Sequence, residues 1–174
     1  NMTLMFSLIQ AAAAAEVGAT LISPFVGRIL DWYKKHENKD SYPPEKDPGV
    51  LSVQAIYKYF KKFGHTTQIM GASFRNKEEI LSLAGCDLLT IAPKFLEELT
   101  NIDGEVPPQL SPSMSLDGVG EKLKITEATF RWLLNENQMA TEQLSDGIRK
   151  FTADLLKLET EVSKKLSSSL AAGV

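Results

Sequence analysis

The sequence has few cysteines and histidines and no long apolar run. Its 174 residues contain one cysteine, Cys86, so no internal disulfide can form. The two histidines, His36 and His65, have no cysteine partners at ligand spacing, which excludes the common zinc patterns. The longest apolar run, around residues 11–15, has polar neighbours and is too short to span a bilayer. No basic segment precedes it, so it does not resemble a signal peptide.

The sequence also lacks a strong excess of charge of either sign. Its formal net charge is -3, which gives no general attraction to nucleic acid or to acidic membranes. Hydrophobic residues make up 43% and charged residues 24%, as in an ordinary globular domain with a sizeable core. Cys86 lies among apolar residues, which predicts an inert, buried thiol in a reducing compartment.

Four short apolar segments, each followed by a helical pattern, recur over residues 1–100. We expect strands at 2–6, 19–23, 66–70 and 87–91, and helices at 7–17, 29–35, 48–63, 76–85 and 93–99. The strand segments are apolar rather than alternating, which suits a parallel sheet buried on both faces. This order predicts an α/β fold. Four βα units are too few to close an eight-stranded (β/α)8 TIM barrel, but they could form half of one.

The rest of the chain is expected to form a long loop and two helices of the same domain. Residues 101–125 are rich in Pro, Gly, Ser and acidic residues and predict the loop. The C-terminal helices, within 126–174, are expected at about 126–135 and 141–170. Apolar side chains recur every three or four positions along the last helix, at Leu144, Ile148, Phe151, Leu155, Leu158 and Val162. A coiled-coil partner could use this stripe, but we favour packing against the chain's own barrel because the stripe is short of heptads.

Polar side chains gather where the expected parallel strands end, and ligands bind at that edge of such sheets. The first strand carries Asn1 and Thr3 on one face. The second and third strands each deliver a serine, a phenylalanine and an arginine: Ser23, Phe25 and Arg28, then Ser73, Phe74 and Arg75. Two guanidiniums with hydroxyls and backbone N–H groups suit a phosphate dianion, and Gly27 and Gly71 would let the backbone approach it closely.

Each of these residues also has a purely structural interpretation. Arginines at the edge of a sheet often pair with nearby carboxylates, and a single arginine favours that interpretation. Two arginines with matching neighbours favour an anion site instead. Phe25 at such an edge packs more often than it contacts a ligand.

Other polar residues are explained without a ligand. His36 and His65 are expected to be solvated. Asp47 is explained as a helix cap, and the pair Glu78 and Glu79 by the positive end of a helix dipole. Lys94 follows the fourth strand and could form a Schiff base, but its place in the first turn of a helix favours a surface lysine.

Several segments together resemble the second half of transaldolase. They are NMTLMFSLIQAAAAAEVGATLISPFVGRILDWY, MGASFRN, LAGCDLLTI and NENQMATEQLSDGIRKF. The run ISPFVGRILDWY is the most specific, and it resembles the larger, classical-type transaldolases. The resemblance covers nearly the whole chain and is weakest over residues 103–124 and in the last few residues.

The resemblance implies a (β/α)8 barrel of the class I aldolase type that needs no metal or organic cofactor. Such enzymes of the pentose phosphate pathway move a dihydroxyacetone unit from sedoheptulose 7-phosphate to glyceraldehyde 3-phosphate through a lysine Schiff base. By the family pattern, Asn1 would bind the dihydroxyacetone unit and Thr3 would help to hold a proton-relaying water. Three residues, Ser23, Arg28 and Arg75, match those around the substrate phosphate, and Phe25 matches a pocket aromatic.

The family pattern also departs from this sequence. It places the Schiff-base lysine, the acid-base glutamate and a catalytic aspartate before Asn1. The sequence begins in what reads as the middle of a strand, so we expect an earlier start for the natural chain and no activity for this chain alone. Expected partners are sugar phosphates and either the missing half of the barrel or a second copy in a homodimer, and the expected compartment is the cytoplasm. A non-catalytic sugar-phosphate-binding or interaction module is the alternative.

Overall fold

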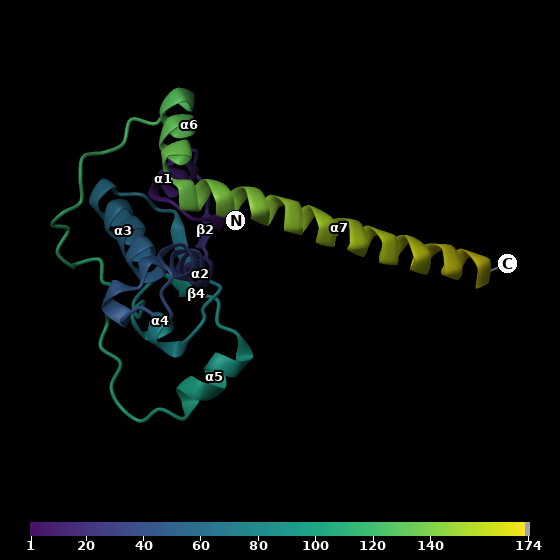
Figure 1. Ribbon diagram of the computed structural model, residues 1–174, viewed down its shortest axis with the longest axis horizontal. Helices are drawn as coiled ribbons and strands as arrows, with labels where there is room; N and C mark the ends of the chain where they lie inside the picture. The colour runs from purple at the N-terminus through teal and green to yellow at the C-terminus, as the bar shows by residue number, and fades with distance from the viewer. Residues whose placement is uncertain (173–174) are drawn as a thin grey trace.

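The computed structural model describes residues 1–172 as an α/β body from which one long helix projects (Figure 1). The strands are β1 (Met2–Met5), β2 (Leu21–Pro24), β3 (Gln68–Gly71) and β4 (Leu88–Leu89). The helices are α1 (Leu8–Glu16), α2 (Val26–Glu37), the 3-10 turn η1 (Pro44–Lys46), α3 (Pro48–Phe63), α4 (Lys77–Leu81), α5 (Pro93–Thr100), α6 (Glu127–Glu136) and α7 (Gln138–Ala172).

The four strands form one parallel sheet in the order β1-β2-β3-β4. The predicted α/β class is therefore confirmed, and the sheet with its connecting helices is consistent with part of a (β/α)8 barrel. The carboxyl ends of the strands are aligned by hydrogen bonds. Phe25 N donates to Met5 O at 3.2 Å, Ala72 N to Pro24 O at 3.0 Å, and Thr90 N to Gly71 O at 2.9 Å.

Side-chain caps fix the starts of four helices, and the cap predicted at Asp47 is confirmed. The side chains of Ser7, Asp47, Asn76 and Thr126 each accept a backbone N–H from the first turn of α1, α3, α4 and α6. Such a cap stabilises a helix by about 1 kcal/mol. Gly18 follows the end of α1 with a φ of +76°, a left-handed conformation that glycine adopts without strain.

Apolar side chains of the sheet and of α1 and α3 form the main core. Ile22 of β2 and Ile69 of β3 are fully buried, as are Val53 and Ile56 of α3. Ala11 and Ala12 of α1 have no exposed surface, which explains the alanine-rich sequence of that helix: small side chains let it lie close to the rest of the core.

Some boundaries differ from the sequence-based expectation. α2 begins at Val26 rather than at residue 29, because Val26 N donates to Ala72 O at 2.9 Å and Gly27 N to Ser73 O at 3.0 Å. β4 is only two residues long. α4 ends at Leu81, and turns lead from there to Gly85, where a Cβ would lie 2.0 Å from Leu110 O.

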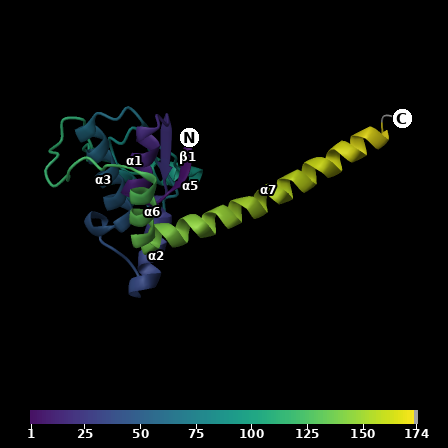
Figure 2. The same ribbon diagram turned by 90° about the horizontal axis from the view of Figure 1, so that it is seen from above.

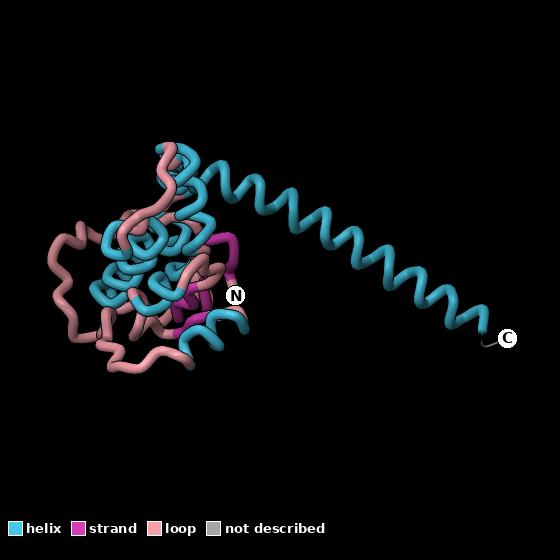
Figure 3. Tube along the Cα trace, turned by 60° about the horizontal axis from the view of Figure 1, so that its bottom comes forward, coloured by secondary structure: helices cyan, strands magenta, loops and turns pink. Residues whose placement is uncertain are grey.

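The long loop between α5 and α6 crosses the side of the body opposite to the one from which α7 projects (Figures 1 and 3). It contains no helix or strand, as expected. Lys62 donates to Val119 O at 2.6 Å, and the Tyr59 hydroxyl accepts from Leu123 N at 3.0 Å. These contacts fasten the loop to α3.

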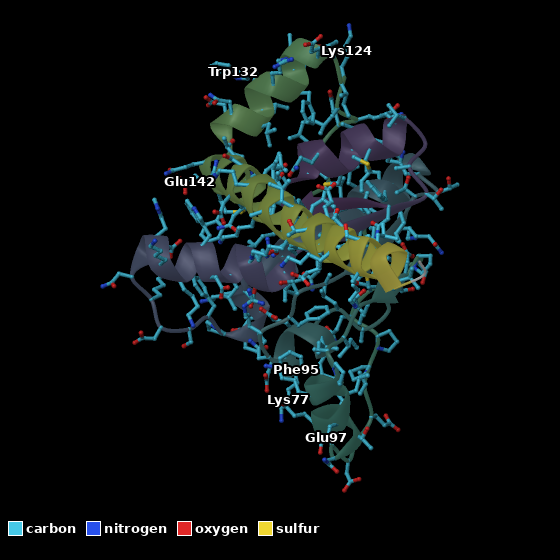
Figure 4. All side chains as sticks on the ribbon, turned by 90° about the vertical axis from the view of Figure 1, so that its right-hand side faces the viewer. Lys77, Phe95, Glu97, Lys124, Trp132 and Glu142 are labelled. Carbon is cyan, nitrogen blue, oxygen red and sulfur yellow. The ribbon has the colours of Figure 1, made fainter. Side chains whose placement is uncertain are left out.

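The first turns of α7 pack on the body, and the rest of the helix extends away from it (Figure 2). Gly147 lies against Leu4 of β1, and Trp32 of α2 donates to Glu142 Oε2 at 2.7 Å. Figure 4 shows Glu142 near the start of α7. Beyond this point the apolar stripe is exposed, at Ile148, Phe151, Leu155, Leu158 and Val162. Among the described residues, no helix is long and apolar enough to cross a membrane. The expectation that the exposed part of this stripe packs against the chain's own barrel stays a prediction.

Candidate functional site

Two of the predicted site residues are hydrogen-bonded across neighbouring strands. Ser23 lies within β2 and is only 3% exposed. Its hydroxyl donates to Asn1 Oδ1 at 2.9 Å, which supplies the partner that a buried hydroxyl needs. Thr3 is exposed on β1, two positions after Asn1 and therefore on the same face of the strand.

Arg28 lies in the first turn of α2 rather than in the loop before it, with its guanidinium between two aromatic rings. The guanidinium carbon is 4.8 Å from the centre of the Phe25 ring and 5.7 Å from that of Phe151. Phe25 is the N-cap residue of α2, whereas Phe151 belongs to α7. Cation–π contacts of this kind hold the charge in place and leave the edge of the guanidinium free to donate hydrogen bonds.

Arg75 follows β3 and pairs with a carboxylate of α2. Its Nε and Nη2 atoms donate to Asp31 Oδ2 at 2.9 and 2.7 Å, and its Nη1 atom donates to Ser73 O at 2.9 Å. The side chains of Arg75 and Asp31 are 40% and 51% exposed. Arg75 therefore pairs with a nearby carboxylate in this structure, as an arginine at the edge of a sheet often does. The exposure of the pair leaves the guanidinium accessible to an anion as well.

Gly27 brings the two arginines to the same turn of α2. A Cβ at Gly27 would lie 2.2 Å from Ser73 O and 2.7 Å from Arg75 Cγ. The space beside Gly27 is therefore filled by the loop after β3, and the expectation that it is kept open for a ligand is wrong. The backbone N–H of Gly27 is used as well, because it donates to Ser73 O. A ligand at this turn would therefore contact side chains and not the backbone of Gly27. Ser73 itself has a φ of +66°.

Two buried carboxyl groups lie behind the Arg75 loop. Asp47 caps α3 by accepting from Gly49 N at 2.8 Å and Val50 N at 3.2 Å. Glu79, in the first turn of α4, accepts from Arg75 N at 2.6 Å. Burial raises the pKa of Asp47, and it raises the pKa of Glu79 to about 7. The sequence analysis assigned Glu79 to the helix dipole, and its burial was missed.

Three other candidates have structural roles here. The prediction that His65 is solvated is wrong. Its side chain is 9% exposed and stacks on Tyr59, with 5.8 Å between the ring centres. Lys94 is exposed, as expected, and its Nζ lies 4.3 Å from the centre of the Phe95 ring at the start of α5. Cys86 is partly buried and donates to Ile69 O at 3.4 Å, and burial raises the pKa of its thiol, as an inert cysteine requires.

A family model described as Transaldolase/Fructose-6-phosphate aldolase matches residues 1–162. The chain belongs to this family. The transaldolase of Protochlamydia amoebophila is 62% identical over 159 residues, 91% of this chain and 49% of that protein. Those of Rattus norvegicus and Homo sapiens are each 56% identical, over 97% and 95% of this chain, 50% and 49% of their own length. The chain thus spans about half the length of the curated transaldolases it matches.

Three residues around the candidate site were missed by the sequence analysis. Asp31 lies one turn after Arg28 on α2, a spacing that could have suggested a shared surface. Phe151 was assigned only to the apolar stripe of α7. Glu79 stands three positions after the N-cap Asn76, the spacing of a capping box, which could have suggested its contact with the loop but not its burial.

Proposed function

We propose that this chain carries the phosphate-binding half of a transaldolase of the pentose phosphate pathway. The reaction is the transfer of a dihydroxyacetone unit from sedoheptulose 7-phosphate to glyceraldehyde 3-phosphate. One observation carries the proposal: in a chain 62% identical to a transaldolase, Arg28 lies in the first turn of α2, and Arg75 lies against Gly27 of the same turn. Two fixed guanidiniums on an accessible surface suit a phosphate dianion.

The proposal gives each predicted site residue a role. Arg28 and Arg75 bind the substrate phosphate, Ser23 belongs to the same site and donates its hydroxyl proton to Asn1, and Phe25 lines the pocket and supports Arg28. Asn1 binds the dihydroxyacetone unit, and Thr3 helps to hold the water that relays protons. The hydrogen bond from Ser23 to Asn1 supports this assignment, because it connects the two groups of residues.

In this proposal the lysine that forms the Schiff base lies outside the chain. Every lysine of the sequence falls within the residues whose burial is described, 1–168, and none is buried. A nucleophilic lysine is usually activated by desolvation in an apolar site. We therefore expect the chain alone to be inactive and to need the other half of the barrel. The single thiol favours the cytoplasm as its compartment.

Calorimetric titration with fructose 6-phosphate tests the phosphate site. Arg28→Ala and Arg75→Ala should each weaken binding about tenfold or more, because each removes a charge-assisted hydrogen-bonding group. Arg131→Ala is the matched control, since Arg131 pairs with Glu127 on α6, far from the site in the fold, and should leave binding unchanged. Equal binding by all three variants and the parent would overturn the anion site.

Borohydride trapping with fructose 6-phosphate separates the enzyme from the alternative, a non-catalytic sugar-phosphate-binding module. The 174-residue chain should acquire no stable label. Label should appear once a complementary half that restores the barrel is supplied. A stable label on the chain alone would make one of its own lysines the nucleophile, with Lys94 the first to check. Phosphate binding without label in either case would favour the binding module.

A further inference from the structure

Glu79 does not fit the role of an ordinary helix-capping glutamate. In a capping box the glutamate is ionised and solvated and reaches back to the backbone at the start of its helix. Glu79 does reach back, since its Oε2 atom accepts from Arg75 N at 2.6 Å. Its side chain, however, is only 1% exposed, and within the described chain no N–H or O–H group donates to its buried Oε1 atom. A carboxylate oxygen left in this way is costly.

The group that faces this carboxyl is another acid. The Asp47 carboxyl at the start of α3 is 3% exposed and lies close enough to Glu79 for its negative charge to raise the pKa of Glu79. Two ionised carboxylates cannot bond to each other, whereas a carboxylic acid can donate to a carboxylate. Asp47 is the better charge carrier of the two, because two backbone N–H groups and the positive end of α3 favour its ionised form. The proton therefore belongs on Glu79.

The remaining charged groups nearby do not supply a better partner. The backbone N–H of Arg75 donates to Glu79, while its guanidinium donates to Asp31 of α2. On α4 itself, Glu78 is exposed and Lys77 is half-buried. The charged residues of α5, which packs against α4, are Lys94, Glu97 and Glu98, and all three are exposed.

We propose that Glu79, in its neutral form, is a positioning residue that bridges the Arg75 main chain and the Asp47 carboxylate. Loss of its proton to a solvent base leaves two buried negative charges side by side and loosens the loop that carries Arg75. This inference rests on the proposed phosphate site for its functional consequence, a phosphate affinity that falls as Glu79 ionises. The bridge itself is independent of that function.

Carboxyl-carbon NMR titration of the chain tests the bridge directly. The Glu79 signal, assigned by its loss in Glu79→Gln, should titrate near pH 7 instead of the ordinary 4.5. The protection of the Arg75 amide against hydrogen exchange should fall about tenfold across this titration, because repulsion between the two carboxylates favours opening of the loop. Glu79→Gln keeps both hydrogen bonds without a titrating proton, so its protection should stay constant. Glu78→Gln is the matched control and should behave like the parent.

Binding of fructose 6-phosphate then tests the consequence. The ratio of the dissociation constants of Glu79→Gln and the parent cancels the titration of the ligand phosphate, and it should change roughly tenfold between pH 6 and pH 8.5. A constant ratio in proteins that bind would overturn the regulation. If neither protein binds at any pH, the proposed phosphate site falls, and the NMR and exchange results alone decide the bridge.

A second variant guards against a Glu79→Gln chain that does not fold. Asp47→Asn keeps an oxygen to cap α3 but carries no charge, and its amide can donate to an ionised Glu79. The midpoint of the Glu79 titration should therefore move down toward 4.5. An unchanged midpoint in this variant, or a midpoint near 4.5 in the parent, would overturn the proposal.

Discussion

At the scale of single residues, the buried acid Glu79 should make the stability of the chain depend on pH. Its pKa in the folded chain is about 7 against 4.5 for the free group, so between these values the folded state binds more protons than the unfolded one. The free energy of unfolding should therefore fall as pH rises from 4.5 to 7, by on the order of 3 kcal/mol. Glu79→Gln should remove this fall and be the more stable protein above pH 7.

Urea unfolding at a series of pH values measures this dependence. Glu78→Gln serves as the control, because the exposed Glu78 carboxyl contributes little, and its profile should follow that of the parent. A Glu79→Gln profile that also follows the parent would mean that Glu79 is ionised in the folded chain at acidic pH.

Single residues were predicted well where their role is local. Asp47 precedes a proline in the first turn of a helix, and its cap could be recognised from that spacing alone. Glu79 and His65 were misjudged, because burial of one side chain depends on segments far away in sequence. Glu79 lies near Asp47 at the start of α3, and His65 stacks on Tyr59 of α3.

At the scale of elements, α2 and the loop after β3 depend on a glycine that lets them touch. In Gly27→Ala the new Cβ would lie 2.2 Å from Ser73 O, a backbone atom that cannot move alone. We expect a loss of about 2–3 kcal/mol in the free energy of unfolding, as for overpacked cores, and weaker phosphate binding because Arg28 and Arg75 are separated.

The control for this change is Gly120→Ala in the long loop, where no atom lies within 4 Å of the new Cβ. It should change the free energy of unfolding by less than about 0.5 kcal/mol. Equal stabilities of the two variants in denaturant unfolding would show that the contact between α2 and the loop contributes nothing to the fold.

Caps and apolar spacing predicted which helices and strands form, but they did not always predict the residue at which an element begins. α2 was expected from residue 29 because the apolar pattern is clear only from Ile29 onward. It begins at Val26 because the backbone of Ala72 and Ser73 accepts the N–H groups of its first residues. That pairing joins segments far apart in sequence, and no local pattern reports it. For the same reason, the sequence predicted Arg28 and Arg75 at the same edge of the sheet but not the ion pair between Arg75 and Asp31.

At the scale of the whole molecule, two features leave surface for a partner. β1 and β4 are the outer strands of the parallel sheet, and strand edges of this kind readily pair with another chain. The exposed part of α7 adds an apolar stripe that includes Leu155 and Leu158. The chain spans about half the length of the transaldolases it matches. We propose that the other half of a barrel, or a second copy, packs on these two surfaces.

Equilibrium sedimentation distinguishes which surface is used. The chain alone should sediment as more than a 19.2 kDa monomer, since burying either surface removes apolar groups or unpaired backbone groups from water. Replacing Leu155 and Leu158 together by Glu should dissociate a complex held by α7, because four charges would face each other in a dimer. Thr3→Pro instead blocks pairing at β1, since proline cannot donate to a strand ladder. A compact monomer for the unaltered chain would contradict both interfaces, and association that survives both changes would direct the search to β4.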